Sequence, residues 1–311
     1  MNYIIIGEPC VDVIHKVNGE VLKSYGGILY SVISMAVLAK ENDHITPVMN
    51  VGEDEYENIK EILEQYPNIK THGLNKVKHP TRKVFLHYNL YNNDKSARVE
   101  TSSEPTYTLA YNQIENFLNN ADAILVNMIS GIDITIETLK NLRKNFSGFI
   151  HIDIHNIVMH TKPDGTRVHT HVENWYEWCT NSDTVQMNEF EIATLSKEKL
   201  SEYKIAEEVL FNKRNPVVGM IVTRGVNGVT GITKKEKSFG GETFYDLDHI
   251  QLAAVENPHF IDSTGCGDVF ASSFTLDYSV TSDFKKSLNY ANRIASLNAS
   301  IGGINKLYKL K

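Results

Sequence analysis

The chain has 311 residues, of which 41% are hydrophobic and 22% are charged. This is the composition of an ordinary folded protein, and it excludes disordered and fibrous classes. The formal net charge of -7 argues against a nucleic-acid or anionic-membrane partner. The three cysteines, Cys10, Cys179 and Cys266, are too widely spaced for a disulfide framework or a zinc-binding pair.

The N-terminal residues, Met1 to Glu8, lack the basic start of a signal peptide, and we expect a cytoplasmic protein. The longest apolar stretch, 28–39, falls short of the approximately 20 residues that a membrane span requires. We therefore predict a buried helix there and expect no membrane partner.

Short apolar runs rich in β-branched residues recur along the chain without the alternation of half-exposed strands. These runs are 3–6, 123–126, 149–152 and 217–223. Residues at helical spacing, such as Ile136, Leu139 and Leu142, lie between them. Strands that alternate with helices predict an α/β fold with a parallel sheet.

Two segments break this pattern, approximately 12–26 and 81–101, because polar and apolar residues alternate in them. We predict that they form exposed antiparallel strands, with a turn at 92–94, and together make a small β lid inserted in one domain that spans 1–311. Residues 234–237 are predicted as a solvated hairpin turn. A terminal amphipathic helix is expected over 284–295, with Gly302 and Gly303 as its stop.

The most informative segment runs from Asp262 to Asp268 and contains Gly265, Cys266 and Gly267 directly before residues at helical spacing. Glycines at a helix N-terminus leave backbone N–H groups free to bind an anion such as a phosphoryl group. An acid at the same place suits a general base that takes a proton from an attacking hydroxyl. The alternative from the residues alone is a tight turn in which Asp268 caps the helix.

A competing cluster is His151, Asp153 and His155, which alternate in a predicted strand. Alternation would aim two imidazoles and a carboxylate to one face, where they could hold a metal ion. A metal-dependent hydrolase is therefore an alternative function.

The run 262–268 resembles the D-T-x-G-A-G-D signature of the ribokinase-like carbohydrate kinases, the PfkB family. Further segments resemble the family's other motifs in the same order along the chain. They are G-x-x-x-x-D at 7–12, G-G-x-x-x-N at 26–31, V-G-x-D at 51–54, N-x-x-E at 188–191 and T-x-G at 223–225. The chain departs from the family at Ser31, where Asn is usual, and at Cys266, where Ala is commoner.

The resemblance implies a doubly wound, mainly parallel sheet with helices on both faces and a small β lid. It implies transfer of the ATP γ-phosphoryl group to a hydroxyl of a sugar or sugar-like substrate. Asp268 would be the base, and the turn Gly265, Cys266 and Gly267 would be the anion hole. The other roles implied are substrate binding by Asp12, Gly26, Gly27 and Ser31, nucleotide binding by Thr223, Gly225, Thr264 and Asn292, and indirect magnesium binding by Asn188 and Glu191.

The resemblance also implies potassium beside Asp262 and the carbonyls of 300–303, and a homodimer that pairs through its lids. A catalytically silent sugar-binding regulator on the same fold is a second alternative, because fold alone does not establish chemistry. The motifs leave open whether the substrate is a sugar, a sugar acid or a nucleoside.

Overall fold

The computed structural model describes residues 1–311 apart from 17, 89–97, 215–216 and 240–241. Its described strands form one large sheet of nine strands and two smaller sheets. The large sheet has the order β15-β14-β13-β12-β9-β8-β1-β4-β5. Its strands are β1 (Asn2–Ile6), β4 (His44–Gly52), β5 (Leu74–Val77), β8 (Ala123–Asn127), β9 (Phe149–Asp153), β12 (Thr184–Asn188), β13 (Gly219–Thr223), β14 (Val229–Phe239) and β15 (Glu242–Leu252).

The strands from β13 to β5 run parallel to their neighbours, and β14 and β15 are antiparallel. Successive residues of β1 bury their side chains on opposite faces, because side chains alternate along a strand. Ile4 and Ile6 belong to one hydrophobic core cluster, whereas Tyr3 and Ile5 belong to another. Both faces of the sheet are therefore covered, which explains the unbroken apolar runs in the sequence.

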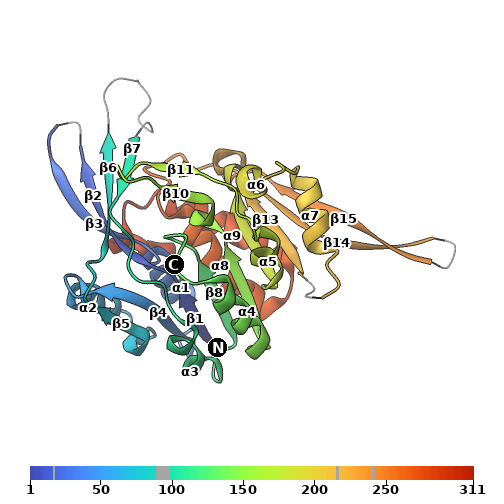
Figure 1. The fold of residues 1–311 in the computed structure, drawn as a ribbon, viewed down its shortest axis with the longest axis horizontal. Helices are drawn as coiled ribbons and strands as arrows, with labels where there is room; N and C mark the ends of the chain where they lie inside the picture. The colour runs from blue at the N-terminus through green and yellow to red at the C-terminus, as the bar shows by residue number, and fades with distance from the viewer. Residues whose placement is uncertain (17, 89–97, 215–216, 240–241) are drawn as a thin grey trace.

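Helices cover both faces (Figure 1). The face of Ile4 packs against α3 (Glu115–Leu118), α4 (Ile136–Asn145), α5 (Trp175–Thr180), α6 (Glu189–Leu195) and α7 (Glu202–Leu210). The other face packs against α1 (Leu29–Leu38), α2 (Tyr56–Glu64), α8 (Cys266–Thr281) and α9 (Phe284–Asn298). The predicted α/β fold, the buried helix at 28–39 and the C-terminal helix are confirmed.

A separate four-stranded sheet lies at one end of the molecule, in the order β3-β2-β6-β7 (Figure 1). Its strands are β2 (Pro9–His15), β3 (Val21–Gly27), β6 (Arg82–Tyr88) and β7 (Arg98–Ser102). The predicted small sheet is confirmed, but β2 and β6 are parallel, so it is not wholly antiparallel as expected. β2 follows β1 and β6 follows β5, and these two parallel strands end at the same edge of the large sheet. β2 and β6 therefore leave that edge in the same direction. The turn predicted at 92–94 lies outside the described residues.

The hairpin turn predicted at 234–237 is wrong, because these residues continue β14. The pairing of β14 with β13 ends at Thr233, and the described residues of β14 beyond it pair with β15. They form a two-stranded ribbon that projects from the end opposite the small sheet (Figure 1). A third, two-stranded sheet joins β10 (Met159–Thr161) and β11 (Arg167–His169). No helix in the described part of the chain is long and apolar enough to cross a membrane.

Candidate active site

The glycine turn lies where the sequence predicts it, at the N-terminus of α8. Gly265 is the N-cap residue with φ of 74°, a left-handed conformation that glycine adopts without strain. A Cβ at Gly265 would lie 2.3 Å from the ring of Tyr30, a buried residue of α1. A Cβ at Gly267 would meet nothing within 4 Å. The turn is thus closed on the Tyr30 side and open beside Gly267.

Asp268 is in the first turn of α8 and is partly buried. Its Oδ1 accepts a hydrogen bond of 2.8 Å from Nδ2 of Asn127, the last residue of β8. Burial raises the pKa of Asp268, while the nearby His155 and the Asn127 hydrogen bond lower it, and the Glu191 carboxylate raises it again. The hydrogen bond from Asn127 thus holds the carboxylate in place at the N-terminus of α8, where an anion would bind.

Asp12 is buried on β2, opposite Ser24 of β3, and the chain then turns back to Gly26 and Gly27. A Cβ at Gly26 would lie 2.4 Å from Oδ2 of Asp12, so only glycine leaves this carboxylate its space. Gly27 has φ of 60°, and a Cβ there would lie 2.6 Å from the carbonyl oxygen of Glu8. The absence of side chains at Gly26 and Gly27 thus lets this part of β3 pack closely against the Asp12 carboxylate and the Glu8 carbonyl.

Ser31 is fully buried in α1, and its hydroxyl is engaged within the protein. The hydroxyl donates to the backbone carbonyl of Asp268 at 3.1 Å and accepts from Nδ2 of Asn127 at 3.3 Å. Ser31 therefore lies next to the base, and its predicted role as a substrate ligand stays a prediction.

Asn188 and Glu191 form a reciprocal capping box at the start of α6. Oδ1 of Asn188 accepts from the amide of Glu191 at 2.9 Å, and Oε2 of Glu191 accepts from the amide of Asn188 at 2.6 Å. Oε1 of Glu191 also accepts from Nδ2 of Asn188 at 2.7 Å. Both residues thus have a structural role, whatever further role they have in metal binding.

The His151, Asp153 and His155 cluster is divided by the structure. His151 is fully buried, and its Nδ1 lies 2.7 Å from Oγ1 of Thr184. Burial lowers the pKa of His151 to about 4. His155 follows the end of β9 with φ of 40°, in the short 3₁₀ helix His155–Val158. Within the described ranges no group of three or more His, Cys, Asp or Glu could hold a metal ion, so the hydrolase alternative has no support.

Asp153 and His155 instead belong to a charged cluster beside Asp268. Nε2 of Gln186 donates to Oδ2 of Asp153 at 3.0 Å and to the carbonyl of Gly267 at 3.1 Å. Burial raises the pKa of Asp153 well above its usual range, and the Glu191 and Asp268 carboxylates raise it further, although His155 lowers it. Desolvation lowers the pKa of His155, but its carboxylate neighbours outweigh this and raise it to about 9. Three acids thus surround one imidazolium.

The residues predicted to bind the nucleotide lie on three different segments. Thr223 ends β13, and Gly225 follows it with φ of 51°. Asn292 on α9 donates to the carbonyl of Ala253 at 2.8 Å, and Oγ1 of Thr264 donates to Asp262 at 2.7 Å. Asn292 also lines an open hollow of about 550 Å³ together with Gln251, Leu252, Ala253, Val255, Asn289, Tyr290 and Arg293.

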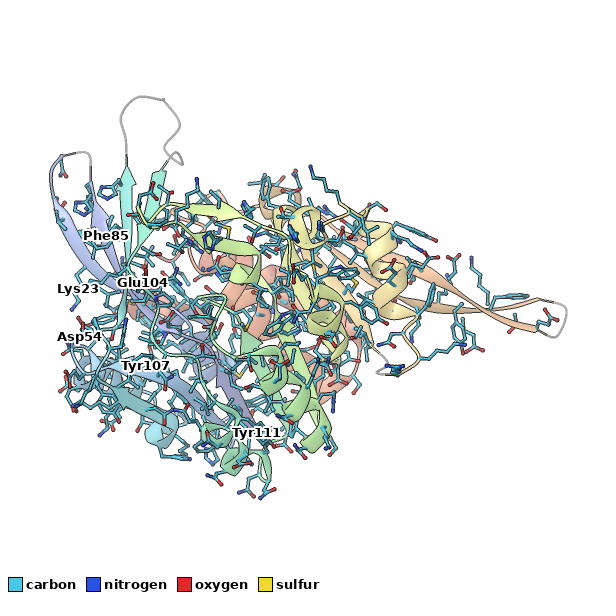
Figure 2. All side chains as sticks on the ribbon, in the orientation of Figure 1. Lys23, Asp54, Phe85, Glu104, Tyr107 and Tyr111 are labelled. Carbon is cyan, nitrogen blue, oxygen red and sulfur yellow. The ribbon has the colours of Figure 1, made fainter. Side chains whose placement is uncertain are left out.

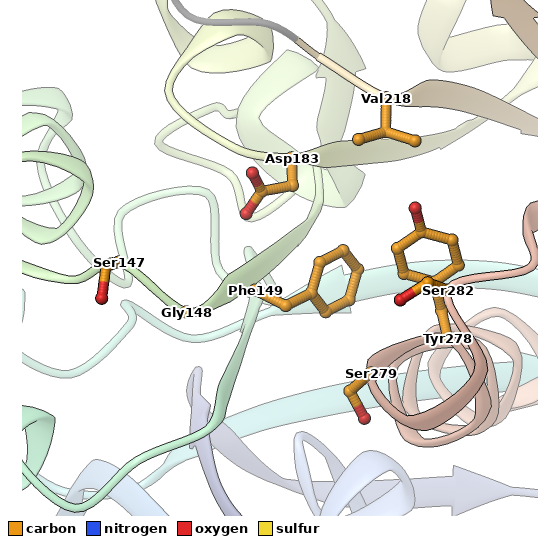
Figure 3. Close-up of a pocket in the computed structure, with 8 residues that line it drawn as sticks. All are labelled: Ser147, Gly148, Phe149, Asp183, Val218, Tyr278, Ser279 and Ser282. Atoms are coloured by element: carbon orange, nitrogen blue, oxygen red, sulfur yellow. The ribbon is translucent and has the colours of Figure 1, made fainter.

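A second, smaller hollow of about 220 Å³ lies away from these residues (Figure 3). The rings of Phe149, the first residue of β9, and Tyr278 of α8 lie side by side in its wall, with Asp183 and Val218 near the amino ends of β12 and β13 (Figure 3). It contains none of the predicted site residues. Of these, Asn188 and Thr223 end β12 and β13 at the opposite, carboxyl edge of the sheet.

The sequence reasoning missed Asn127, Gln186 and Tyr30. Asn127 and Gln186 lie at or near the carboxyl ends of buried strands, which is the signal that could have identified them. Tyr30 carries no such signal, because its contact with Gly265 joins segments that are 235 positions apart in the chain.

Comparison with known proteins gives a family match and a fold match. Residues 160–307 match the sequence pattern described as pfkB family carbohydrate kinase. This segment contains the 188–191 and 262–268 motifs but neither Asp12 nor Gly26. No curated protein matches the chain.

Solved structures match almost the whole chain at low sequence identity. A ribokinase from Thermotoga maritima is 19% identical with a TM-score of 0.73, over 98% of this chain and 95% of that one. A ribokinase from Arabidopsis thaliana, complexed with ribose and ATP, is 17% identical with a TM-score of 0.68, over 99% and 97%. A nucleoside kinase from Burkholderia thailandensis, in complex with inosine, is 14% identical with a TM-score of 0.74, over 99% and 94%. The ribokinase-like fold is confirmed.

Proposed function

From a PfkB-family carbohydrate-kinase segment on a ribokinase-like fold, we propose that this protein transfers the γ-phosphoryl group of ATP to a hydroxyl of a sugar or sugar-like substrate. One observation carries the proposal. Asp268 stands in the first turn of α8, directly after a left-handed glycine turn that is open beside Gly267. A base and an anion site therefore lie side by side.

In the proposed reaction Asp268 accepts the proton of the attacking hydroxyl, and the N-terminus of α8 stabilises the charge that develops on the transferred group. The amides of Gly265, Cys266 and Gly267 are the proposed donors. The Cys266 amide already donates to the carbonyl of Ser263 at 3.1 Å, so it would share that hydrogen with a bound phosphoryl group.

Asp12 is the proposed ligand of substrate hydroxyls, because a carboxylate can accept two of them and the missing side chain at Gly26 leaves room for this carboxylate. Gly27 and Ser31 complete this side of the site. The small sheet that carries Asp12 is the proposed lid, and its closure would exclude water from the phosphoryl group.

The hollow beside α9 is the proposed place of the nucleotide base, with Asn292 on its wall and Thr223, Gly225 and Thr264 toward the phosphates. The residues present also fit magnesium. In the described part of the chain these residues do not form a direct metal site, but the carboxylates of Asp153, Glu191 and Asp268 beside the His155 imidazolium provide negative charge for a cation held through water. Magnesium would neutralise phosphate charge, and Glu191 and Asn188 would bind it through water.

The donor has one competitor. A pyrophosphate-dependent kinase of the ribokinase family, complexed with a pyrophosphate analog and myo-inositol, shares this fold at 14% identity, a TM-score of 0.70 and 97% and 96% coverage. The hollow beside α9 favours ATP, because pyrophosphate has no base to fill it. The silent-regulator alternative has no support from the comparisons.

The test is phosphoryl transfer with magnesium and either ATP or pyrophosphate, over ribose, fructose, 2-keto-3-deoxygluconate, inosine and myo-inositol. We expect one acceptor class to stimulate ADP release, and Asp268→Asn to reduce kcat about a hundredfold or more. If an acceptor is phosphorylated with pyrophosphate but not with ATP, pyrophosphate is the donor. Wild-type turnover in Asp268→Asn would contradict the assignment of the base.

Potassium and the homodimer stay predictions. The Asp262 carboxylate accepts from the amide and hydroxyl of Thr264. Higher activity in potassium than in sodium would support the cation. A monomer in sedimentation at working concentration would contradict the dimer.

A further inference from the structure

Asn127 joins three elements by hydrogen bonds beside the proposed base. It is fully buried at the end of β8. Its Nδ2 donates to Oδ1 of Asp268 on α8 at 2.8 Å and to Oγ of Ser31 on α1 at 3.3 Å. The Ser31 hydroxyl in turn donates to the backbone carbonyl of Asp268 at 3.1 Å. The side chain and the backbone of Asp268 are thus both bound to one closed network.

This arrangement costs stability, which points to a role other than packing. Oδ1 of Asn127 is buried and has no hydrogen-bond partner in the part of the chain that the structure describes. A buried, unsatisfied carbonyl is destabilising, whereas a leucine of similar size would leave no orphaned polar atom on β8. The reverse orientation of the amide would place Oδ1 against the Asp268 carboxylate, so the observed orientation is the favourable one.

We propose that Asn127 is a positioning residue that fixes the Asp268 carboxylate for proton abstraction, an inference that rests on the proposed function. Because Asn127 occupies Oδ1, Oδ2 is the oxygen left for the substrate hydroxyl. A hydrogen bond to the carboxylate also favours its charged form. Asn127 therefore favours the ionised form of a base that is partly buried beside other acids.

The ionisation of Asp268 depends on groups from every element around it. These groups are Asp153 at the end of β9, His155 in the 3₁₀ helix after it, Glu191 on α6, Tyr30 on α1 and Cys266 on α8 itself. Of these, only His155 stabilises the carboxylate by its charge. Removing the Asn127 amide should therefore raise the pKa of Asp268.

The experiment compares Asn127→Leu with the wild type in magnesium and ATP, with whichever acceptor of the panel above gives the highest rate. We expect kcat to fall at least about tenfold, while KM for ATP and for the acceptor changes less than about twofold. The acidic limb of the pH profile of kcat/KM should move to higher pH, which a purely structural role would not cause.

Two further variants distinguish a loss of positioning from a general loss of folding stability. Asn127→Asp has nearly the same shape, and its charge beside Asp268 should move the acidic limb in the same direction. Asn50→Leu is the matched control, because Asn50 is a buried amide that donates to the Tyr107 carbonyl at 2.6 Å, away from Asp268. It should lose stability without moving the pH profile.

The double variant Asn127→Leu/Asp268→Asn separates the inference from the proposed function. If Asn127 acts through Asp268, the double variant should be no slower than Asp268→Asn alone. A further tenfold loss, or an unchanged pH profile in Asn127→Leu, would overturn the positioning role. Wild-type turnover in Asp268→Asn would instead overturn the proposed function itself.

Discussion

Gly265 and Gly267 flank the same cysteine, yet the structure gives them different roles. Gly265 is required by the fold, because its left-handed φ of 74° and the ring of Tyr30 leave no room for a Cβ. Gly267 lies inside α8, and its Cβ position is open. The open position is where a bound phosphoryl group would approach the helix.

This difference predicts the outcome of two alanine substitutions. Gly267→Ala should keep or raise the unfolding free energy, by up to about 1 kcal/mol, because alanine is the better helix former. Its kcat should nevertheless fall at least about tenfold, since the methyl group would occupy the anion site. Gly265→Ala should lose stability in chemical denaturation. Full activity in a stable Gly267→Ala would show that the phosphoryl group does not bind beside Gly267.

His151 shows how burial alone can decide the behaviour of a titratable side chain. The imidazole is fully buried between strands and bonded to Thr184. Its pKa of about 4 in the folded protein, against an ordinary 6.5, means that the folded state binds its proton less readily than the unfolded state. The stability that neutral His151 provides is complete above about pH 6.5 and is lost as the pH falls toward 4.

We expect His151→Leu to unfold more easily than the wild type at pH 7.5, because Thr184 loses its partner. The difference should shrink by up to about 3 kcal/mol between pH 6.5 and 4. Urea unfolding at several pH values measures it. His169→Leu, at an exposed position, is the control and should show a constant difference. A constant difference in His151→Leu would contradict the neutral, buried imidazole.

At the scale of an element, the two side chains that cap α6 are also the residues proposed to bind magnesium through water. Each Glu191 oxygen accepts a hydrogen bond from Asn188, so the capping box fully engages the carboxylate within the helix end. A glutamine can also complete a capping box, but it lacks the charge that a cation requires. Substitution can therefore separate the cap from the metal role.

Glu191→Gln should reduce the unfolding free energy by only about 1 kcal/mol. It should raise the magnesium concentration needed for half-maximal activity several-fold, as measured by titration at saturating ATP. The matched control is Ser201→Ala, which removes the cap of α7 at Lys204. The control should lose similar stability with no change in the magnesium requirement. An unchanged requirement in Glu191→Gln would leave the residue as a cap only.

At the scale of the whole molecule, buried charges join the small sheet to the large one. Glu8 follows β1, and its Oε1 accepts from the hydroxyl of Thr106 at 2.6 Å. Arg82, the first residue of β6, donates to the carbonyl of Ile129 at 3.2 Å. Its Nη1 lies 3.8 Å from Oε2 of Glu8. Figure 2 shows Lys23, Asp54 and Glu104 around the same base of the small sheet.

The titration of Glu8 gives a prediction for this junction. Burial raises the pKa of Glu8 to about 6, and Asp133 adds to the rise although Arg82 opposes it. The folded state thus binds the Glu8 proton more readily than the unfolded state. The stability from this group is complete below about pH 4.5 and is lost as the pH rises through 6.

Glu8→Gln removes this titration. Relative to the variant, the wild type should lose about 2 kcal/mol of unfolding free energy between pH 4.5 and 7.5. Glu104→Gln, an exposed change two residues before Thr106, should show no such trend. A wild type that gains stability relative to Glu8→Gln as the pH rises would mean that Arg82 outweighs burial.

The local sequence determined the buried strands of this protein and the glycine turn before α8. The apolar runs predicted the buried strands, because a strand covered on both faces needs no polar residues. The glycine turn before α8 was predicted because Gly265 and Gly267 stand directly before residues at helical spacing. The relative directions of β2 and β6 and the projecting ribbon were mispredicted. Alternating residues suit parallel and antiparallel pairing equally, and charged residues suit an exposed strand as well as a turn.

The surroundings of the proposed base were decided only by the tertiary structure. Asn127, Ser31 and Asp268 come from β8, α1 and α8, and their hydrogen bonds exist only because the sheet order brings these elements together. The same is true of His151, Asp153 and His155, whose spacing suggested one metal site. Their partners, Thr184, Gln186 and Glu191, lie on other elements and divide the cluster. Spacing along the chain fixes which residue types lie near one another locally, whereas hydrogen bonds and burial depend on neighbours that are distant in sequence.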